Sequence, residues 1–274
     1  MPFRLTPTFR DALLARDSRR PFVGMWVCSG SPLVAEICAG SGVDWLLVDM
    51  EHSPNGLESV LAQLQAVAAY PVTPVVRVPI GDAVTIKQVL DVGAQNLLVP
   101  MVSSADDARA VVEAVRYPPG GRRGVGGSLA RSTRWNRVDG YLADAGRHVS
   151  LVVQVETAEA VAAADEIAAV DGVDAVFVGP ADLAASLGNL GRQDHPDVVA
   201  AVHRTFAAVR GAGKPVGVNA FDPDLARAYA DAGADFVAVG ADVSLLARGS
   251  EALAARFAEI ADPGTRPAPG STGP

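Results

Sequence analysis

Polar side chains of the kinds used in catalysis recur at the ends of short apolar runs in this 274-residue sequence. Such runs are typical of buried parallel strands, and in barrels of strands and helices the residues that follow the strands build the active site. The residues concerned are Asp49, Glu51, His52, Arg77, Gln154, Glu156, Asp182 and Asn219. Proton transfer and anion binding could therefore take place together at one rim.

Two of these carboxylates have the chemistry of metal ligands. Glu156 ends the apolar run 150–156, and Asp182 follows the next run, 171–179. A pair of hard oxygen ligands suits Mg²⁺ or Mn²⁺, which take water and substrate oxygens in their remaining positions. Acids are also favoured where helices begin. The spacing alone leaves a metal pair and two helix-starting acids equally open.

His52 lies three residues after Asp49. An aspartate can fix the tautomer of a histidine and raise its basicity, which gives a general base near neutral pH. Taken alone, however, a histidine at this position is better explained as a rim residue that caps the next helix.

Arg77 interrupts an otherwise apolar run, 74–79. A buried arginine requires an anionic or carbonyl partner. A substrate carboxylate or a developing enolate oxygen would serve, and so, equally, would a structural carboxylate such as Glu51.

The sequence contains only two lysines, Lys87 and Lys214. Lys87 falls within a predicted helix, and Lys214 precedes a predicted strand, at the opposite end of the barrel. Neither is placed to form a Schiff base at the rim. If the chain is an aldolase, it must stabilise its enolate with a metal.

A repeated pattern defines the elements that position these residues. In this pattern a glycine is followed by a few residues that include a polar one, and then by an apolar run. It indicates the end of a helix followed by a buried strand. This pattern occurs at 41–49, 92–100, 171–179 and 232–240, and further strands fit 21–27, 74–79, 150–156 and 214–219. Helical segments lie between them at 56–70, 83–92, 105–116, 158–170, 195–213 and 222–233. Eight alternations of strand and helix predict an α/β fold, a (β/α)₈ TIM barrel.

Two long gaps interrupt the alternation, 117–137 and 186–197. Both are predicted at the C-terminal face, where barrel enzymes build their sites. The first contains GRRGVGG, which could bind an anion through backbone N–H groups and Arg122 or Arg123, or could simply be a flexible loop.

The chain is expected to form one barrel domain over 1–261, in which 245–261 is a last helix. The Pro- and Gly-rich segment 262–274 is predicted to be a disordered tail.

Composition excludes several classes of protein. The chain has a net charge of −8 and no long basic run, so nucleic acid is an unsuitable partner. No apolar run is long enough to cross a membrane, and residues 1–18 lack the apolar core of a signal peptide. Cys28 and Cys38 suggest neither a zinc site nor a disulfide framework, which fits a reduced, cytoplasmic setting.

Over about residues 10–260 the sequence resembles the HpcH/HpaI aldolase family, and is closest to the branch that cleaves 4-hydroxy-2-oxoheptanedioate. The most specific strings are DWLLVDMEHSPNG, VQVET and VFVGPADLAASLG; others are GMWVCSGSP, PVVRVP, YPPGGRRGVGG, RWNR and FVAVGADVSLLARG. The strand-seven string GVNAFDPD, in the region that shapes the acceptor side, departs from that branch.

The resemblance implies a class II pyruvate aldolase, a carbon–carbon lyase. Family members bind Mg²⁺, Mn²⁺ or Co²⁺ through the residues that match Glu156 and Asp182. The base would be His52, supported by Asp49, and Arg77 would stabilise the enolate. The pocket for the 2-oxo acid would be lined by Gln154, Ala181 and Trp26.

The resemblance also implies partners. The donor would be pyruvate or hydroxypyruvate, and succinic semialdehyde is the first expectation for the aldehyde. A 2-keto-3-deoxy sugar-acid aldolase comes next, and an acyl-CoA lyase like citrate lyase β or malyl-CoA lyase is a further alternative. Family members are typically homohexamers, trimers of dimers that exchange the last helix.

Overall fold

Eight parallel strands pair in the order of the sequence, and the last strand pairs with the first to close a barrel. The structure is a computed structural model that describes residues 5–16 and 20–258. The strands are β1 Phe22–Val27, β2 Trp45–Asp49, β3 Thr73–Arg77, β4 Asn96–Val99, β5 Ser150–Val155, β6 Ala175–Val178, β7 Val216–Asn219 and β8 Phe236–Ala241. Each matches a predicted strand, and the TIM barrel is confirmed. Most strand residues are buried because helices cover the outer face.

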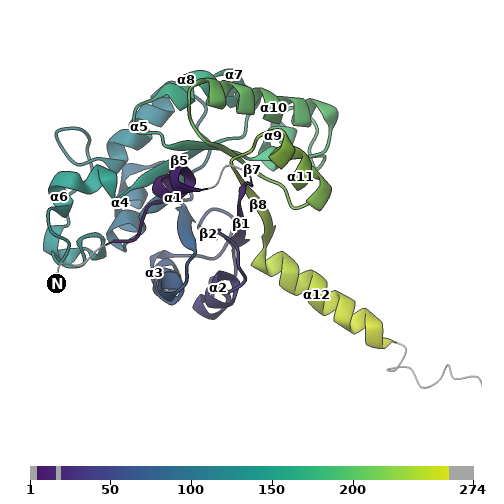
Figure 1. The fold of residues 1–274 in the computed structure, drawn as a ribbon, viewed down its shortest axis with the longest axis horizontal. Helices are drawn as coiled ribbons and strands as arrows, with labels where there is room; N and C mark the ends of the chain where they lie inside the picture. The colour runs from purple at the N-terminus through teal and green to yellow at the C-terminus, as the bar shows by residue number, and fades with distance from the viewer. Residues whose placement is uncertain (1–4, 17–19, 259–274) are drawn as a thin grey trace, which may run out of the picture.

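The helices surround this barrel (Figure 1). They are α1 Phe9–Ala15, α2 Pro32–Ala39, α3 Leu57–Ala66, α4 Ala83–Asp91, α5 Ala105–Val115, α6 Tyr141–Asp144, α7 Ala158–Ala162, α8 Ala164–Ala169, α9 Pro180–Ser186, α10 Pro196–Gly211, α11 Pro223–Asp231 and α12 Asp242–Phe257. Short 3₁₀ turns are η1 Val67–Ala69, η2 Gly127–Leu129, η3 Arg131–Thr133 and η4 Ala145–Arg147. The helix predicted over 158–170 is divided into α7 and α8 at Ala163, where φ is −103° and ψ is 12°.

Aromatic side chains fill the barrel at the end where the strands begin. The ring centroid of Phe236 lies 5.9 Å from that of Trp45 and 5.2 Å from that of Phe9. Phe9, at the start of α1, is fully buried, and its backbone N–H donates to Asn96 Oδ1 at 2.6 Å. Helix α1 therefore closes this end, and the opposite end remains available for a site.

The segment 117–137 lies at the end of the barrel where the strands begin, so its predicted position at the C-terminal face is wrong. Its Arg131 donates from Nη1 to the carbonyl of Val92, just past the end of α4. Arg123 is buried, pairs with Asp91 at 3.2 Å and lies over the Tyr117 ring. The segment follows a helix rather than a strand, and connections from helix to strand lie at that end.

Helix α12 extends away from the barrel (Figure 1). Its side chains Leu245, Leu246, Leu253 and Phe257 are all more than half exposed. The end of the predicted helix 245–261 and the predicted tail 262–274 reach beyond residue 258 and lie outside the described residues. Among the helices that the structure describes, none is both long enough and apolar enough to cross a membrane.

We predict that Gly24→Ala lowers the free energy of unfolding by about 1–3 kcal/mol or more, because overpacking a filled core forces neighbours out of place. A Cβ on Gly24 would lie 2.2 Å from Trp45 Cε2. Gly211 is the matched control, since a Cβ there meets nothing within 4 Å, and Gly211→Ala should stabilise by up to about 1 kcal/mol. Urea unfolding measures both, and equal effects would contradict this packing.

Candidate active site

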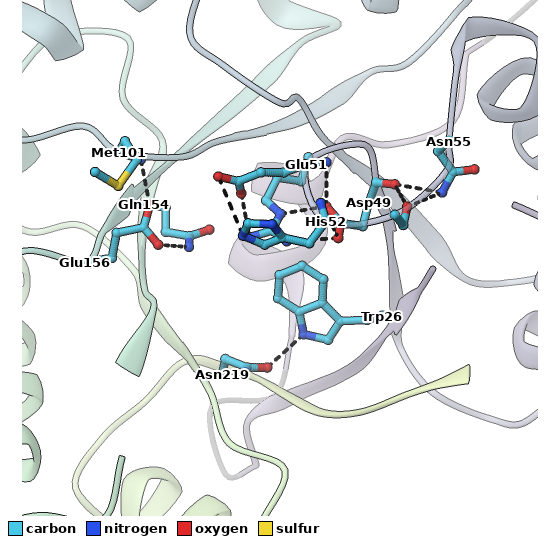
Figure 2. Close-up of polar contacts among 11 residues, drawn as sticks. Trp26, Asp49, Glu51, His52, Asn55, Met101, Gln154, Glu156 and Asn219 are labelled. Carbon is cyan, nitrogen blue, oxygen red and sulfur yellow. Dashed lines mark hydrogen bonds and ion pairs between the residues drawn. The ribbon is translucent and has the colours of Figure 1, made fainter. Parts of the chain in front are cut away.

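A cleft of about 280 Å³ opens where the strands end. Its lining includes eight of the residues that the sequence singled out, namely Trp26, Asp49, His52, Arg77, Gln154, Ala181, Asp182 and Asn219. Glu156, which the sequence also singled out, contacts the lining residue Gln154 (Figure 2). The remaining lining residues are Cys28, Phe177, Gly179, Pro180, Phe221, Ala241, Val243 and Ser244.

Arg77 forms a buried ion-pair network at the end of β3. Its Nε and Nη2 donate to the two oxygens of Asp49 at 2.8 and 2.9 Å, and its Nη1 lies 2.8 Å from Glu51 Oε2. The guanidinium carbon is 4.2 Å from the centroid of the Trp26 ring, a cation–π contact. Both carboxylates and the aromatic face therefore fix the planar guanidinium on the cleft wall.

Asp49 also organises the loop that carries His52. Its oxygens accept the backbone N–H groups of Glu51 at 3.0 Å and His52 at 3.3 Å. Its carbonyl accepts from Ser53 Oγ and from Asn55 Nδ2. Asp49 thus shapes a tight turn directly after β2, and this turn directs the next side chains into the cleft mouth.

The imidazole of His52 stands at that mouth, with 65% of its side chain exposed. Its Nε2 lies 3.9 Å from Glu51 Oε1. Asp49 contacts the backbone of His52, and the carboxylate that the structure places beside the ring is Glu51 (Figure 2). Partial burial is the main reason that the pKa of Glu51 is raised, and Arg77 opposes that rise.

Glu156 follows β5 and is buried. Burial raises the pKa of its carboxyl to about 7, assisted by the negative charges of Glu51 and Asp182, while hydrogen bonds from Met101 and Gln154 oppose the rise. The backbone N–H of Met101 donates to Oε1 at 2.7 Å, and Gln154 Nε2 donates to Oε2. Met101 adopts φ of 56°, unusual for a residue with a side chain, and this conformation accompanies the contact.

Gly179 allows Glu156 to sit where it does. A Cβ on Gly179 would lie 2.7 Å from both Glu156 Oε2 and Gln154 Nε2, so only glycine leaves room for these groups. Asp182 comes three residues later, in the first turn of α9, and its side chain is exposed to the cleft. Strands β5 and β6 thus bring the two carboxylates to neighbouring positions.

Two residues of the site went without a role in the sequence analysis. Asn219, at the end of β7, accepts the indole N–H of Trp26 at 2.7 Å. Asp242 is buried at the start of α12, where it accepts the backbone N–H groups of Cys28 at 2.8 Å and Ser29 at 3.0 Å. Asp242 directly follows β8, so the rule that found the other residues would have found it as well.

Comparison with known proteins agrees with the resemblance seen in the sequence. The profile of the HpcH/HpaI aldolase/citrate lyase family matches residues 23–249. A hydroxypyruvate/pyruvate aldolase of Deinococcus radiodurans is 53% identical over 98% of this chain and 97% of its own length. A 4-hydroxy-2-oxo-heptane-1,7-dioate aldolase of Salmonella dublin is 53% identical over 91% of this chain and 94% of its own.

A solved structure gives the same result. A HpcH/HpaI aldolase/citrate lyase family protein from Burkholderia cenocepacia superposes with a TM-score of 0.87 at 43% identity, over 92% of this chain and 100% of that one. Aldolases at 53% identity over most of the chain support its assignment as a carbon–carbon lyase. The chain belongs to the HpcH/HpaI aldolase/citrate lyase family.

Proposed function

We propose that this chain is a metal-dependent class II aldolase that joins pyruvate or a related 2-oxo acid to an aldehyde and cleaves the product. The observation that carries the proposal is the buried carboxylate of Glu156, close to Asp182 and Glu51, beside a cleft that Asp182 and Arg77 line. The negative charges of Glu51 and Asp182 help to raise the pKa of Glu156, and carboxylates gathered in this way favour a cation between them.

The residues present fit a divalent cation. Glu156 and Asp182 are hard oxygen donors, and Gly179 leaves the space that the Glu156 carboxylate occupies. Within the described part of the chain, no cluster of three or more His, Cys, Asp or Glu forms a complete metal site. Water and substrate oxygens would therefore fill the other positions, as is usual for Mg²⁺, with Mn²⁺ and Co²⁺ as alternatives. A bound cation acts as a Lewis acid that makes the methyl protons of a 2-oxo acid more acidic.

Arg77 is suited to hold the charge of the enolate. A guanidinium has five N–H groups, and the hydrogen bonds to Asp49 use two of them, while Nη1 forms an ion pair with Glu51. The remaining N–H groups are available to an oxygen in the cleft, and the ion pairs keep them in place before substrate arrives. Fixed donors aimed at developing charge are an effective source of catalysis.

His52 is the group that moves the proton. It is exposed at the mouth of the cleft, and Glu51 lies beside its ring. In the synthetic direction it would take a proton from the methyl carbon of pyruvate, and in cleavage it would take one from the aldol hydroxyl. Lys214 lies just before β7, and its Nζ donates to the carbonyl of Val173, which lies just before β6. Both positions are where the strands begin, far from this rim, so Lys214 does not offer a Schiff base.

We predict that Glu156→Gln loses at least about a hundredfold in pyruvate C3 proton exchange, because a Lewis acid supplies several kcal/mol of charge stabilisation. Deuterium incorporation followed by NMR measures this. Glu159→Gln, an exposed acid in α7, is the matched control and should behave as the unaltered protein. EDTA should abolish exchange, and Mg²⁺ or Mn²⁺ should restore it; full exchange after exhaustive chelation would refute the metal assignment.

A second prediction separates His52 from Arg77. Loss of CO₂ from oxaloacetate gives the same enolate as pyruvate but needs no proton taken from carbon. His52→Ala should lose aldol cleavage by about 10²–10⁴-fold, the usual effect of a general base, and keep much more decarboxylation. Arg77→Lys should lose both, because a compact ammonium does not reproduce the planar fork.

The ratio of the two activities in each variant is the measurement. His203→Ala, in the middle of α10, is the control for His52. Equal loss of both activities in His52→Ala would show that another residue is the base.

We also propose that α12 packs on a neighbouring copy of the chain, in a homohexamer arranged as a trimer of dimers. The exposed apolar side chains of Leu246, Leu253 and Phe257 support this, because they recur at a spacing that gathers them on one side of the helix. Such a stripe is usually covered by a partner.

Leu246→Glu should therefore reduce the mass measured by light scattering, because it places a charge in an apolar interface. Arg248→Glu, about half a turn away on the same helix, is the control and should leave the mass unchanged. A monomer of the unaltered protein would exclude the exchange of α12.

A further inference from the structure

The cleft has two chemically different halves. The walls built from β2, β3, β5 and β6 carry the charged groups, among them Asp49, Arg77 and Asp182. The residues that line the cleft from β1, β7, β8 and the first turn of α12 form a neutral wall, and they are Trp26, Cys28, Asn219, Phe221, Ala241, Val243 and Ser244. The second half has no cation of its own among the described residues that line the cleft.

Asn219 has a fixed orientation in the neutral wall. The indole nitrogen of Trp26 is only a donor, so the atom of Asn219 that lies 2.7 Å from it must be the carbonyl oxygen Oδ1. Trp26 is itself held, because its ring lies under the guanidinium of Arg77. The indole therefore determines which way the Asn219 amide points (Figure 2).

The other end of that amide remains available. Within the described residues, Asn219 Nδ2 has no hydrogen-bond partner, and the side chain is half-buried on the cleft wall. Ser244 lines the same wall from α12, and its hydroxyl likewise has no partner in the described chain. Two neutral hydrogen-bonding groups thus lie on a wall that is otherwise mostly apolar.

We propose that Asn219 is the residue that selects the aldehyde, and that it selects a small neutral hydroxyaldehyde through a hydrogen bond from Nδ2 to the hydroxyl oxygen. This inference rests on the proposed aldolase function. A hydroxyl satisfies the amide, and an alkyl chain leaves it unpaired, which costs binding energy. A carboxylate, as in succinic semialdehyde, finds no cation on this wall. This proposal differs from succinic semialdehyde, the first expectation for the aldehyde, and the test below compares the two.

The chemistry of the step is unchanged by this choice. The enolate carbon of pyruvate forms the new bond to the aldehyde carbon, and the aldehyde oxygen receives a proton. No further reagent is consumed. The Asn219 contact acts on the hydroxyl next to the reacting carbonyl, so it contributes to binding and orientation of the acceptor and not to formation of the enolate.

The test compares acceptors of equal size with pyruvate as donor. Glycolaldehyde and propionaldehyde differ by a hydroxyl in place of a methyl, and the ratio of their kcat/KM values isolates that group. The unaltered protein should prefer glycolaldehyde and should also prefer it to succinic semialdehyde. Asn219→Leu should lower the ratio by about tenfold, which corresponds to one hydrogen bond.

Two further variants separate a direct contact from a general disturbance. Trp26→Phe keeps an aromatic ring beside Arg77 but removes the indole N–H, so the Asn219 amide loses its fixed orientation and the ratio should again fall. Val243→Ala, an apolar member of the same wall, should change the rates with both aldehydes together and leave their ratio as it was.

Pyruvate C3 exchange, which uses no aldehyde, is measured alongside in every variant. The role of Asn219 would be overturned if Asn219→Leu retained exchange and left the aldehyde ratio unchanged. It would also be overturned if the unaltered protein preferred propionaldehyde or succinic semialdehyde. No exchange in the unaltered protein with Mg²⁺ or Mn²⁺ present would instead refute the proposed function.

Discussion

The cleft depends on one buried contact, the pairing of Arg77 with Asp49 and Glu51. Three charges taken out of water are unstable unless each is satisfied, so this contact dictates where β2 and β3 end relative to each other. The register follows directly, because Asp49 and Arg77 are direct partners in the pairing of the two strands. Removal of Arg77 would leave both carboxylates without their cation in a poorly hydrated site.

The pairing of Arg77 with Asp49 and Glu51 also positions side chains in both halves of the cleft. On one side it fixes Glu51, which lies beside the His52 ring. On the other it presents a flat cation to the Trp26 ring, which in turn donates to Asn219. A continuous set of contacts therefore connects the acid–base group to the far wall, and no mobile element is needed to align them.

The barrel and most of its site were predictable from the sequence because parallel strands are buried on both faces and their apolar runs are easily seen. The polar residue that ends each run is equally visible, which is why Glu156 and Asp182 were found. The pairing of Trp26 with Asn219 was not predictable, since 193 residues separate them and only closure of the barrel brings β1 close to β7. The segment 117–137 was misplaced because its position depends on which way the preceding helix runs.

The division of the cleft between strands has a consequence for how such enzymes diverge. The groups proposed to make the enolate come from β2, β3, β5 and β6, whereas the wall that meets the second substrate comes from β1, β7, β8 and α12. Substitutions after β7 or at the start of α12 can therefore accumulate without disturbing the charged network. A lineage can acquire a new aldehyde through a few neutral changes on one arc of the barrel, while the ancestral reaction at the opposite arc stays under selection throughout.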